Sequence, residues 1–212
     1  MRIAFINENS QGAKNGLLVG VLKKVAEPLG HQVDNYGVYS PEDKAQITYV
    51  QVGILAAILL NSGAADFVVT GCGTGEGAMI ACNAFPGVFC GHIVDPTDAF
   101  QFTQINNGNC VSLPFLKGWG WGAELNLQYV FEKLFIEPWG AGYPQERAAV
   151  EQKNAGILTD VKKATQRDLL DVLPRLDEEL LKGAIAGEKF EELFFANAKD
   201  EKIKDYIRAL KA

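Results

Sequence analysis

Short apolar runs alternate with stretches of helical periodicity along most of the chain. The apolar runs predict five strands, at 2–7, 32–37, 66–70, 88–91 and 110–114. Between the first two runs, apolar residues recur at helical spacing, with charged residues on the opposite face. Five cycles of strand and helix are typical of a parallel sheet with helices on both faces. The pattern therefore predicts an α/β protein, built as a three-layer α/β/α sandwich around a five-stranded parallel sheet.

Two helices are predicted from their first residues. Ser40-Pro41-Glu42-Asp43 combines a capping serine, a proline suited to the first helical position and acids at the positive end of the helix. The predicted helix runs to about Leu60 and is apolar on most sides. It should therefore be buried between the sheet and a second layer, such as another subunit. Asp95-Pro96 predicts another helix, to about Ile105, by the same logic.

The composition changes near Tyr143, beyond which charged residues become frequent. We expect residues 1–150 to form the α/β domain, and 151–212 to form a helical C-terminal extension too small to be an independent domain. Three residues are expected to break its helices: Gly156, Pro174 and Gly187. Its last helix should carry an amphipathic stripe of Ile203, Tyr206, Ile207 and Leu210.

Polar loops follow several of the predicted strands. In Rossmann-like sheets, ligands bind beyond the carboxyl ends of the strands. Four loops are expected at that edge: 8–10, 71–77, 92–95 and 106–109. The second of them, Gly-Cys-Gly-Thr-Gly-Glu-Gly, lies between a strand and a helix start. Such a loop presents backbone N–H groups to an anion.

Three side chains of this glycine loop can take part in proton transfer: Cys72, Thr74 and Glu76. A helix N-terminus stabilises a thiolate or a carboxylate beside it, so either Cys72 or Glu76 could remove a proton next to a carbonyl. Glycine N–H groups could then stabilise the resulting enediolate. The structural alternatives are a small apolar filler for Cys72, an ordinary first-turn acid for Glu76 and a helix cap for Thr74.

The same loop loosely fits the dinucleotide fingerprint, as Gly73-x-Gly75-x-x-Ala78 with Asp95 as the ribose-binding acid. The match is weak, because the loop follows the third predicted strand and Glu76 would repel a pyrophosphate. A nucleotide cofactor is therefore disfavoured.

The charge and the cysteine content disfavour several classes of function and location. The net charge is −6, the pI is about 5.0, and no basic block is present, which disfavours nucleic-acid binding and, more weakly, a membrane surface. The longest apolar run, 50–60, is too short to span a bilayer. Met1-Arg2 leads straight into a strand, so no signal peptide is expected. We expect a cytoplasmic protein with buried free thiols at Cys82, Cys90 and Cys110.

The chain resembles the ribose-5-phosphate isomerase B family, which includes galactose-6-phosphate isomerases. The motifs that carry the resemblance are Ile3-Ala4-Phe5, Gly71-Cys72-Gly73-Thr74-Gly75, Ala81-x-Asn83 and Asn106-x-x-Asn109. It covers residues 1–150, and the glycine loop is its most specific part. The resemblance implies aldose–ketose isomerisation of a sugar phosphate through a cis-enediol, with no metal or other cofactor. It also implies homodimers, or dimers of dimers, whose active sites use both subunits.

The resemblance also assigns roles to residues. It makes Cys72 or Glu76 the base, Thr74 the ring-opening hydroxyl, and Glu8 the acid after the first strand. It places the substrate against the backbone of the glycine loop, with Asn106 completing the anion hole. The implied backbone positions are Gly71, Gly73, Gly75 and Gly77.

The chain departs from the family pattern at three places. Glu8-Asn9 stands where the family has Asp-His, and Ile105 replaces a histidine that helps open the sugar ring. In the family's Gly-Arg-x-x-x-Arg phosphate motif, Tyr143 replaces the first arginine and Arg147 keeps the second. His92, at the end of the fourth predicted strand, is either a substitute for a lost histidine or a structural residue.

The departures lead to hypotheses about the substrate and about the function. Each charge-assisted contact contributes about 1.5–3 kcal/mol. Loss of the first arginine should therefore lower the affinity for phosphate, unless other residues replace its contact. The substrate would then be open-chain, or it would lack a phosphate altogether. The alternatives to an isomerase are a non-catalytic sugar- or nucleotide-binding module on the same fold and a structural dimer with a vestigial site.

Overall fold

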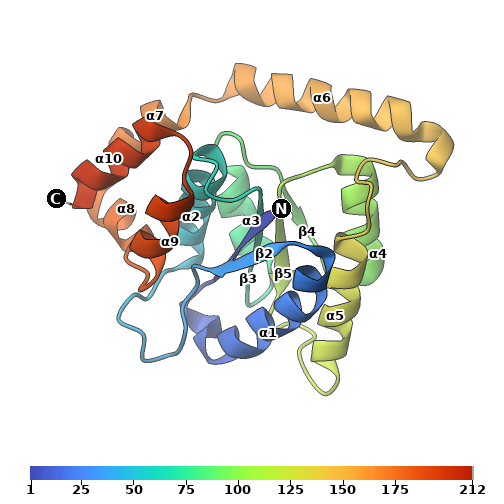
Figure 1. Ribbon diagram of the computed structural model, residues 1–212, viewed down its shortest axis with the longest axis horizontal. Coiled ribbons are helices and arrows are strands. Elements are labelled where there is room, and N and C mark those ends of the chain that lie inside the picture. Colours follow the sequence, from blue (N-terminus) through green and yellow to red (C-terminus); the bar gives the residue numbers. More distant parts are fainter. Residues whose placement is uncertain (212) are drawn as a thin grey trace.

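The computed structural model describes residues 1–211 of the 212-residue chain. Its centre is one parallel sheet with the strand order β2-β1-β3-β5-β4 (Figure 1). The strands are β1 (Arg2–Asn7), β2 (Gln32–Asn35), β3 (Phe67–Cys72), β4 (Cys90–His92) and β5 (Cys110–Pro114). The predicted five-stranded parallel sheet is confirmed.

Helices cover both faces of this sheet. Successive side chains of a strand point to opposite faces, and in β1 Ile3 and Phe5 pack into one core while Ala4 and Ile6 pack into the other. The first core is closed by α1 (Asn15–Ala26), α4 (Pro96–Gln101) and α5 (Ala123–Leu134), and the second by α2 (Tyr49–Asn61) and α3 (Glu76–Asn83). The three-layer α/β/α sandwich is therefore confirmed.

Helix α2 is buried from Val52 to Leu59 without interruption. One side of it packs on the sheet, and the other packs on the C-terminal extension. The residues that complete this core come from α7 (Leu169–Val172), η5 (Leu173–Arg175), α8 (Glu178–Ala184), α9 (Phe190–Asn197) and α10 (Glu201–Lys211). The second layer expected over this helix is therefore supplied by the chain itself.

The predicted start of this helix at Ser40 is wrong. Residues 40–43 form a turn, in which the Asp43 N–H donates to the Ser40 carbonyl at 3.1 Å. The helix begins after Thr48, which forms a reciprocal capping box with Gln51. The preceding residues have no regular secondary structure, and the Ile47 carbonyl accepts a hydrogen bond from the Asn9 N–H, at 2.8 Å. This bond ties the segment to the loop after β1.

Helix α6 (Ala148–Thr165) runs along the outside of the molecule and leads to the extension (Figure 1). It continues through Gly156, so the predicted break there is wrong. None of its residues is buried, and a glycine inside an exposed helix costs only about 1 kcal/mol relative to alanine. The shorter helical turns are η1 (Asn9–Lys14), η2 (Glu27–Leu29), η3 (Phe102–Asn106) and η4 (Gln145–Arg147). No helix within residues 1–211 is long and apolar enough to cross a membrane.

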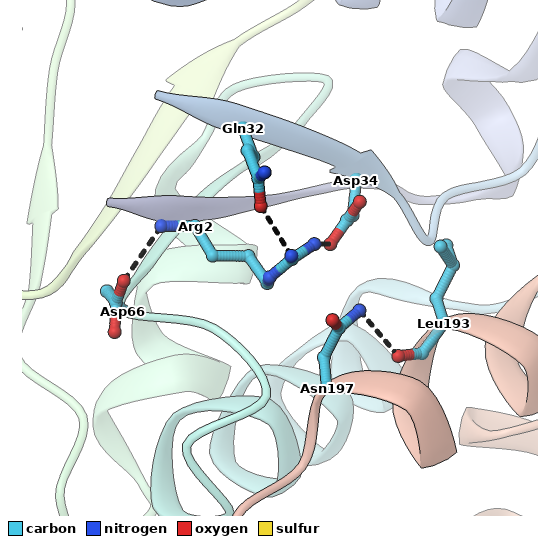
Figure 2. Close-up of polar contacts among 6 residues, drawn as sticks. All are labelled: Arg2, Gln32, Asp34, Asp66, Leu193 and Asn197. Carbon is cyan, nitrogen blue, oxygen red and sulfur yellow. Dashed lines mark hydrogen bonds and ion pairs between the residues drawn. The ribbon is translucent and has the colours of Figure 1, made fainter. Parts of the chain in front are cut away.

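Arg2 joins the amino end of β1 to its neighbours (Figure 2). Its guanidinium pairs with Asp34 at 2.6 Å and donates to Gln32, both on β2, while its backbone N–H donates to Asp66 at 2.7 Å. Figure 2 also shows Asn197 of α9, which donates to the carbonyl of Leu193 at 2.8 Å. The Arg2 contacts fix the sheet edge that lies opposite the glycine loop, whereas the Asn197 bond lies within α9.

Candidate active site

The glycine loop 71–77 joins β3 to α3 at the carboxyl edge of the sheet. Gly75 takes a left-handed backbone conformation, with φ of +81°, and caps α3. Two residues of neighbouring strands contact carbonyl groups of the loop. The buried Ser112 hydroxyl of β5 donates to the Gly75 carbonyl at 2.6 Å, and the His92 Nε2 of β4 lies 2.9 Å from the Thr74 carbonyl. The loop is therefore fixed by side chains on two strands.

Cys72 lies at the base of this loop, with 8% of its surface exposed. The Gly75 N–H donates to its Sγ across 3.2 Å. An N–H directed at sulfur, next to a helix N-terminus, stabilises negative charge on that sulfur. The arrangement suits a thiol that gives up and takes back a proton.

Glu76 is more solvated than Cys72. Its side chain is 57% exposed, and its Oε1 lies 3.9 Å from the Nζ of Lys117. Thr74 is also exposed, and its Oγ1 accepts a hydrogen bond from the Glu76 N–H at 3.3 Å. The loop also positions Lys117, whose backbone N–H donates to the Gly73 carbonyl at 2.9 Å. The three predicted side chains of the loop therefore share one edge with a lysine.

Glu8 and Asn9 follow β1 at the same edge, because Asn7 is paired with Gly71 in the sheet. The Glu8 carboxylate is buried and accepts hydrogen bonds from the backbone N–H of Ser10 at 2.8 Å and from its hydroxyl at 2.5 Å. Glu8 thereby caps η1. The structure brings both residues to the side of the sheet where the glycine loop lies.

Lys14, at the end of η1, also lies near the candidate site, and the sequence did not indicate this. Its ammonium donates to Gln11 Oε1 at 3.0 Å and to the carbonyl of Phe115, just beyond β5, and it lies 4.9 Å from the ring centre of Trp119. Burial lowers the pKa of Lys14. The only signal in the sequence is a lysine next to the apolar face of the first helix, which does not distinguish it from a surface residue.

A hollow of about 200 Å³ adjoins this edge. Its lining includes Lys117, which contacts the glycine loop, and Trp119, which contacts Lys14. Its walls come from the residues after β4, the end of β5, the segment 117–119 and α5, and include Ile93, Pro114, Trp119 and Asn126. No residue of the loop 71–77 lines the hollow. A small polar molecule held at the loop would therefore have the Lys117 ammonium nearby.

Asn106, Tyr143 and Arg147 lie elsewhere. Asn106 ends η3, which precedes β5, so it lies at the amino edge of the sheet. Cys72 pairs with Pro114, at the carboxyl end of β5. Pro114 lies four residues beyond Cys110, the first residue of β5, and four steps of about 3.3 Å make the two ends of this strand about 13 Å apart. The expectation that loop 106–109 shares an edge with the glycine loop is therefore wrong, because this loop leads into a strand instead of leaving one.

The segment of Tyr143 is attached to the same amino edge. The Gly140 and Gly142 N–H groups donate to the carbonyls of Thr103 and Gln104, on η3, at 2.9 and 3.1 Å. The Tyr143 ring packs on Phe100 of α4. Within one chain, the predicted substrate-binding residues thus form two groups, one at each edge of the sheet.

One cluster of side chains within residues 1–211 is close enough to share a metal ion. It consists of Cys82, Cys90 and Cys110, whose thiols are free and buried, as predicted. It lies near the amino end of β5 and is separate from the glycine loop.

Two family models match the chain. The ribose/galactose isomerase model covers residues 3–137, and a second model, described as ribose-5-phosphate isomerase, covers residues 164–210. No protein of curated function matches significantly.

Two solved structures match nearly the whole chain. A 4-deoxy-L-threo-5-hexosulose-uronate ketol-isomerase, complexed with a tartrate, has 58% identity and a TM-score of 0.97, covering 99% of each chain. A ribose-5-phosphate isomerase of Vibrio parahaemolyticus has 51% identity and a TM-score of 0.96, again over 99% of each chain.

A more distant structure shares the fold. The type B ribose 5-phosphate isomerase of Leishmania infantum has 19% identity and a TM-score of 0.63, covering 78% of this chain and 98% of its own. The family model spans most of the chain, and the glycine loop on which the resemblance rests lies inside the matched range. The chain therefore belongs to the ribose/galactose isomerase family and is a sugar isomerase.

Proposed function

We propose that this protein interconverts an aldose and a ketose that carry a carboxylate, through a cis-enediol, with Cys72 as the base. The observation that supports this most directly is the Cys72 sulfur held under the glycine loop by the Gly75 N–H. The substrate would lie against the glycine loop, with the Lys117 ammonium close to Glu76 at the same edge.

Cys72 is favoured over Glu76 by its surroundings. Its sulfur is shielded from water and receives an N–H, whereas the Glu76 carboxylate is exposed and loosely paired with Lys117. A base that works next to a carbonyl benefits from a site that excludes water. Glu76 is the alternative base, and its variants serve as the comparison.

The reaction is a balanced proton transfer. The Cys72 thiolate removes the proton from C2 of the aldose, and the C2 electron pair forms the C1–C2 double bond of an enediolate. The oxygen on C1 takes a proton, and N–H groups of the loop stabilise the negative charge before it does. The Cys72 thiol then returns its proton to C1, and loss of the C2 hydroxyl proton leaves a C2 ketone. No electron leaves or enters overall.

Two close relatives point to different substrates. The relative at 58% identity acts on a hexosulose-uronate and was solved with a tartrate, a dicarboxylate, whereas the relative at 51% is a ribose-5-phosphate isomerase. Tyr143 replaces an arginine of the family's phosphate motif, and Ile105 replaces the ring-opening histidine. Both changes favour an open-chain substrate with a carboxylate. Ribose 5-phosphate is the second candidate.

We further propose a homodimer in which each site uses both subunits. Apolar side chains of α6 are about half-exposed along one stripe: Val150, Ile157, Leu158 and Val161. A second copy packed on this helix would cover them. Because Asn106 and Arg147 lie near the start of α6, such packing would carry them towards the partner's glycine loop. This accounts for their separation from that loop within one chain.

The substrate assignment is tested by comparing kcat/KM for an open-chain hexosulose-uronate, ribose 5-phosphate and the corresponding free sugars. The uronate should be the best substrate. Lys117→Met should raise its KM about tenfold, the effect of losing one charge-assisted contact of about 1.5 kcal/mol. Lys24→Met, which changes an exposed lysine on α1 bonded to Gln128, is the matched control and should leave KM unchanged. A higher kcat/KM for ribose 5-phosphate would refute the assignment.

A further inference from the structure

Three cysteines from three separate elements lie close together in the interior. Cys82 lies on α3, Cys90 on β4 and Cys110 on β5, and their sulfur atoms all lie within 4.8 Å of one another. Cys90 and Cys110 are register partners on neighbouring strands, which places them side by side. All three are buried and free. The isomerase reaction uses none of them.

From this geometry we propose that Cys82, Cys90 and Cys110 bind one Cu(I) ion as three thiolate ligands. In a three-coordinate site with metal–sulfur bonds of about 2.3 Å, neighbouring sulfurs lie about 4.0 Å apart. A contraction of at most about 0.8 Å would therefore bring the three sulfurs to bonding distance.

The donor set favours a soft ion with few ligands. Thiolates select Cu(I), zinc and iron–sulfur clusters. Structural zinc sites almost always have four protein ligands, and no histidine or carboxylate within residues 1–211 joins the three sulfurs. Cu(I) accepts three sulfur ligands without a fourth, so it fits this cluster better than zinc.

Lys162 supplies a positive charge beside the cluster. It comes from α6, and its ammonium donates to the carbonyl of Val88 and lies 4.6 Å from the ring centre of Phe89. The ammonium therefore offsets part of the charge that three thiolates would bring into the interior.

Each thiol that binds the metal releases its proton, and the copper stays Cu(I) throughout, so the step needs no oxidant or reductant. A hollow of about 180 Å³ is lined by Phe89, Lys162 and Gln166, and Phe89 precedes Cys90 in the chain.

The test is an anaerobic titration of the reduced protein with Cu(I) held by a competing chelator, followed by X-ray absorption of the wild-type complex. We expect one Cu(I) per chain with three sulfur neighbours. Cys82→Ser and Cys110→Ser should each weaken binding at least tenfold. Cys72→Ser changes the one cysteine outside the cluster and should bind Cu(I) like the wild type.

Three results would overturn the proposal. The first is no removal of Cu(I) from the chelator by the wild-type protein. The second is equal loss of binding in Cys72→Ser and Cys110→Ser, with circular dichroism showing both folded. The third is tight binding of Zn(II) without Cu(I) in a parallel titration. The wild-type spectrum does not depend on any variant, so misfolding of a serine variant cannot hide the answer.

Discussion

The geometry of the glycine loop makes a sharp prediction at Gly75. Its φ of +81° lies in the left-handed region, where a residue with a Cβ loses about 1–2 kcal/mol. A Cβ at this position would also lie 2.8 Å from the carbonyl carbon of Leu113 and 2.8 Å from the His92 Nε2. Overpacking of this kind adds about 1–3 kcal/mol. Gly75→Ala should therefore lower the free energy of unfolding by about 2–5 kcal/mol.

Gly73 is the matched control in the same loop. Its backbone is outside the left-handed region, and the nearest atoms to an added Cβ belong to Leu116, at 3.8 Å. Gly73→Ala should therefore change the free energy of unfolding by less than about 1 kcal/mol. Denaturant unfolding of the two variants, followed by circular dichroism, measures the difference.

Activity adds a second measurement to this comparison. A Cβ at Gly75 displaces the His92 ring or the loop that carries the Cys72 partner N–H. A displacement of about 1 Å in a catalytic site costs about 100-fold in rate, so kcat/KM of Gly75→Ala should fall by about that factor. Equal stability of Gly75→Ala and the wild type, or equal destabilisation by Gly73→Ala, would refute this description of the loop.

Three further predictions concern the rest of the molecule. Phe194→Ala, in the core shared by α2 and the extension, should cost about 3–5 kcal/mol of unfolding free energy, and the partly buried Phe195 should cost less when changed to Ala. Burial lowers the pKa of His31, as does the nearby N-terminal amine, from the usual 6.5. The unfolded chain therefore binds this proton at higher pH than the folded chain. The resulting contribution to the free energy of unfolding is present above about pH 6.5 and is lost as pH falls through the folded pKa. Urea unfolding between pH 8 and about 5 should therefore show a free energy of unfolding that depends less on pH in His31→Leu than in the wild type. Ile157→Asp, on the exposed stripe of α6, should weaken self-association in sedimentation experiments, and an unchanged mass would contradict the proposed interface.

The layers of the fold could be predicted because their signals are local. The apolar runs of β1 and β5 and the capping box at Asp95 each specify one element through nearby residues. The all-round apolar pattern of α2 also predicted a second cover. It could not say that this cover is the chain's own extension, because the contacts lie more than 100 residues apart.

The candidate site was only partly predictable for the same reason. The glycine loop is one continuous stretch, so its groups could be found together in the sequence. Lys14 and Ser112 act on the loop through the fold, and neither has a distinctive neighbourhood in the sequence. Asn106 was placed at the wrong edge although the predicted strand at 110–114 follows it, which by itself puts this turn at the amino edge of the sheet. The start of α2 was misplaced because Ser40 meets every local requirement of a cap, while the bond from Asn9 to Ile47 does not show in the sequence.

The central claim is that the Cys72 sulfur carries a proton between two neighbouring carbons of the substrate. The direct measurement is deuterium incorporation during isomerisation of an open-chain hexosulose-uronate, an aldose with a carboxylate, in deuterated water, read at C1 of the product ketose. Deuterium reaches C1 when the thiol proton exchanges with the solvent before it is returned. We predict incorporation by the wild-type protein and by Glu76→Gln, and its loss, together with turnover, in a folded Cys72→Ala. Full turnover and exchange in Cys72→Ala would contradict the account.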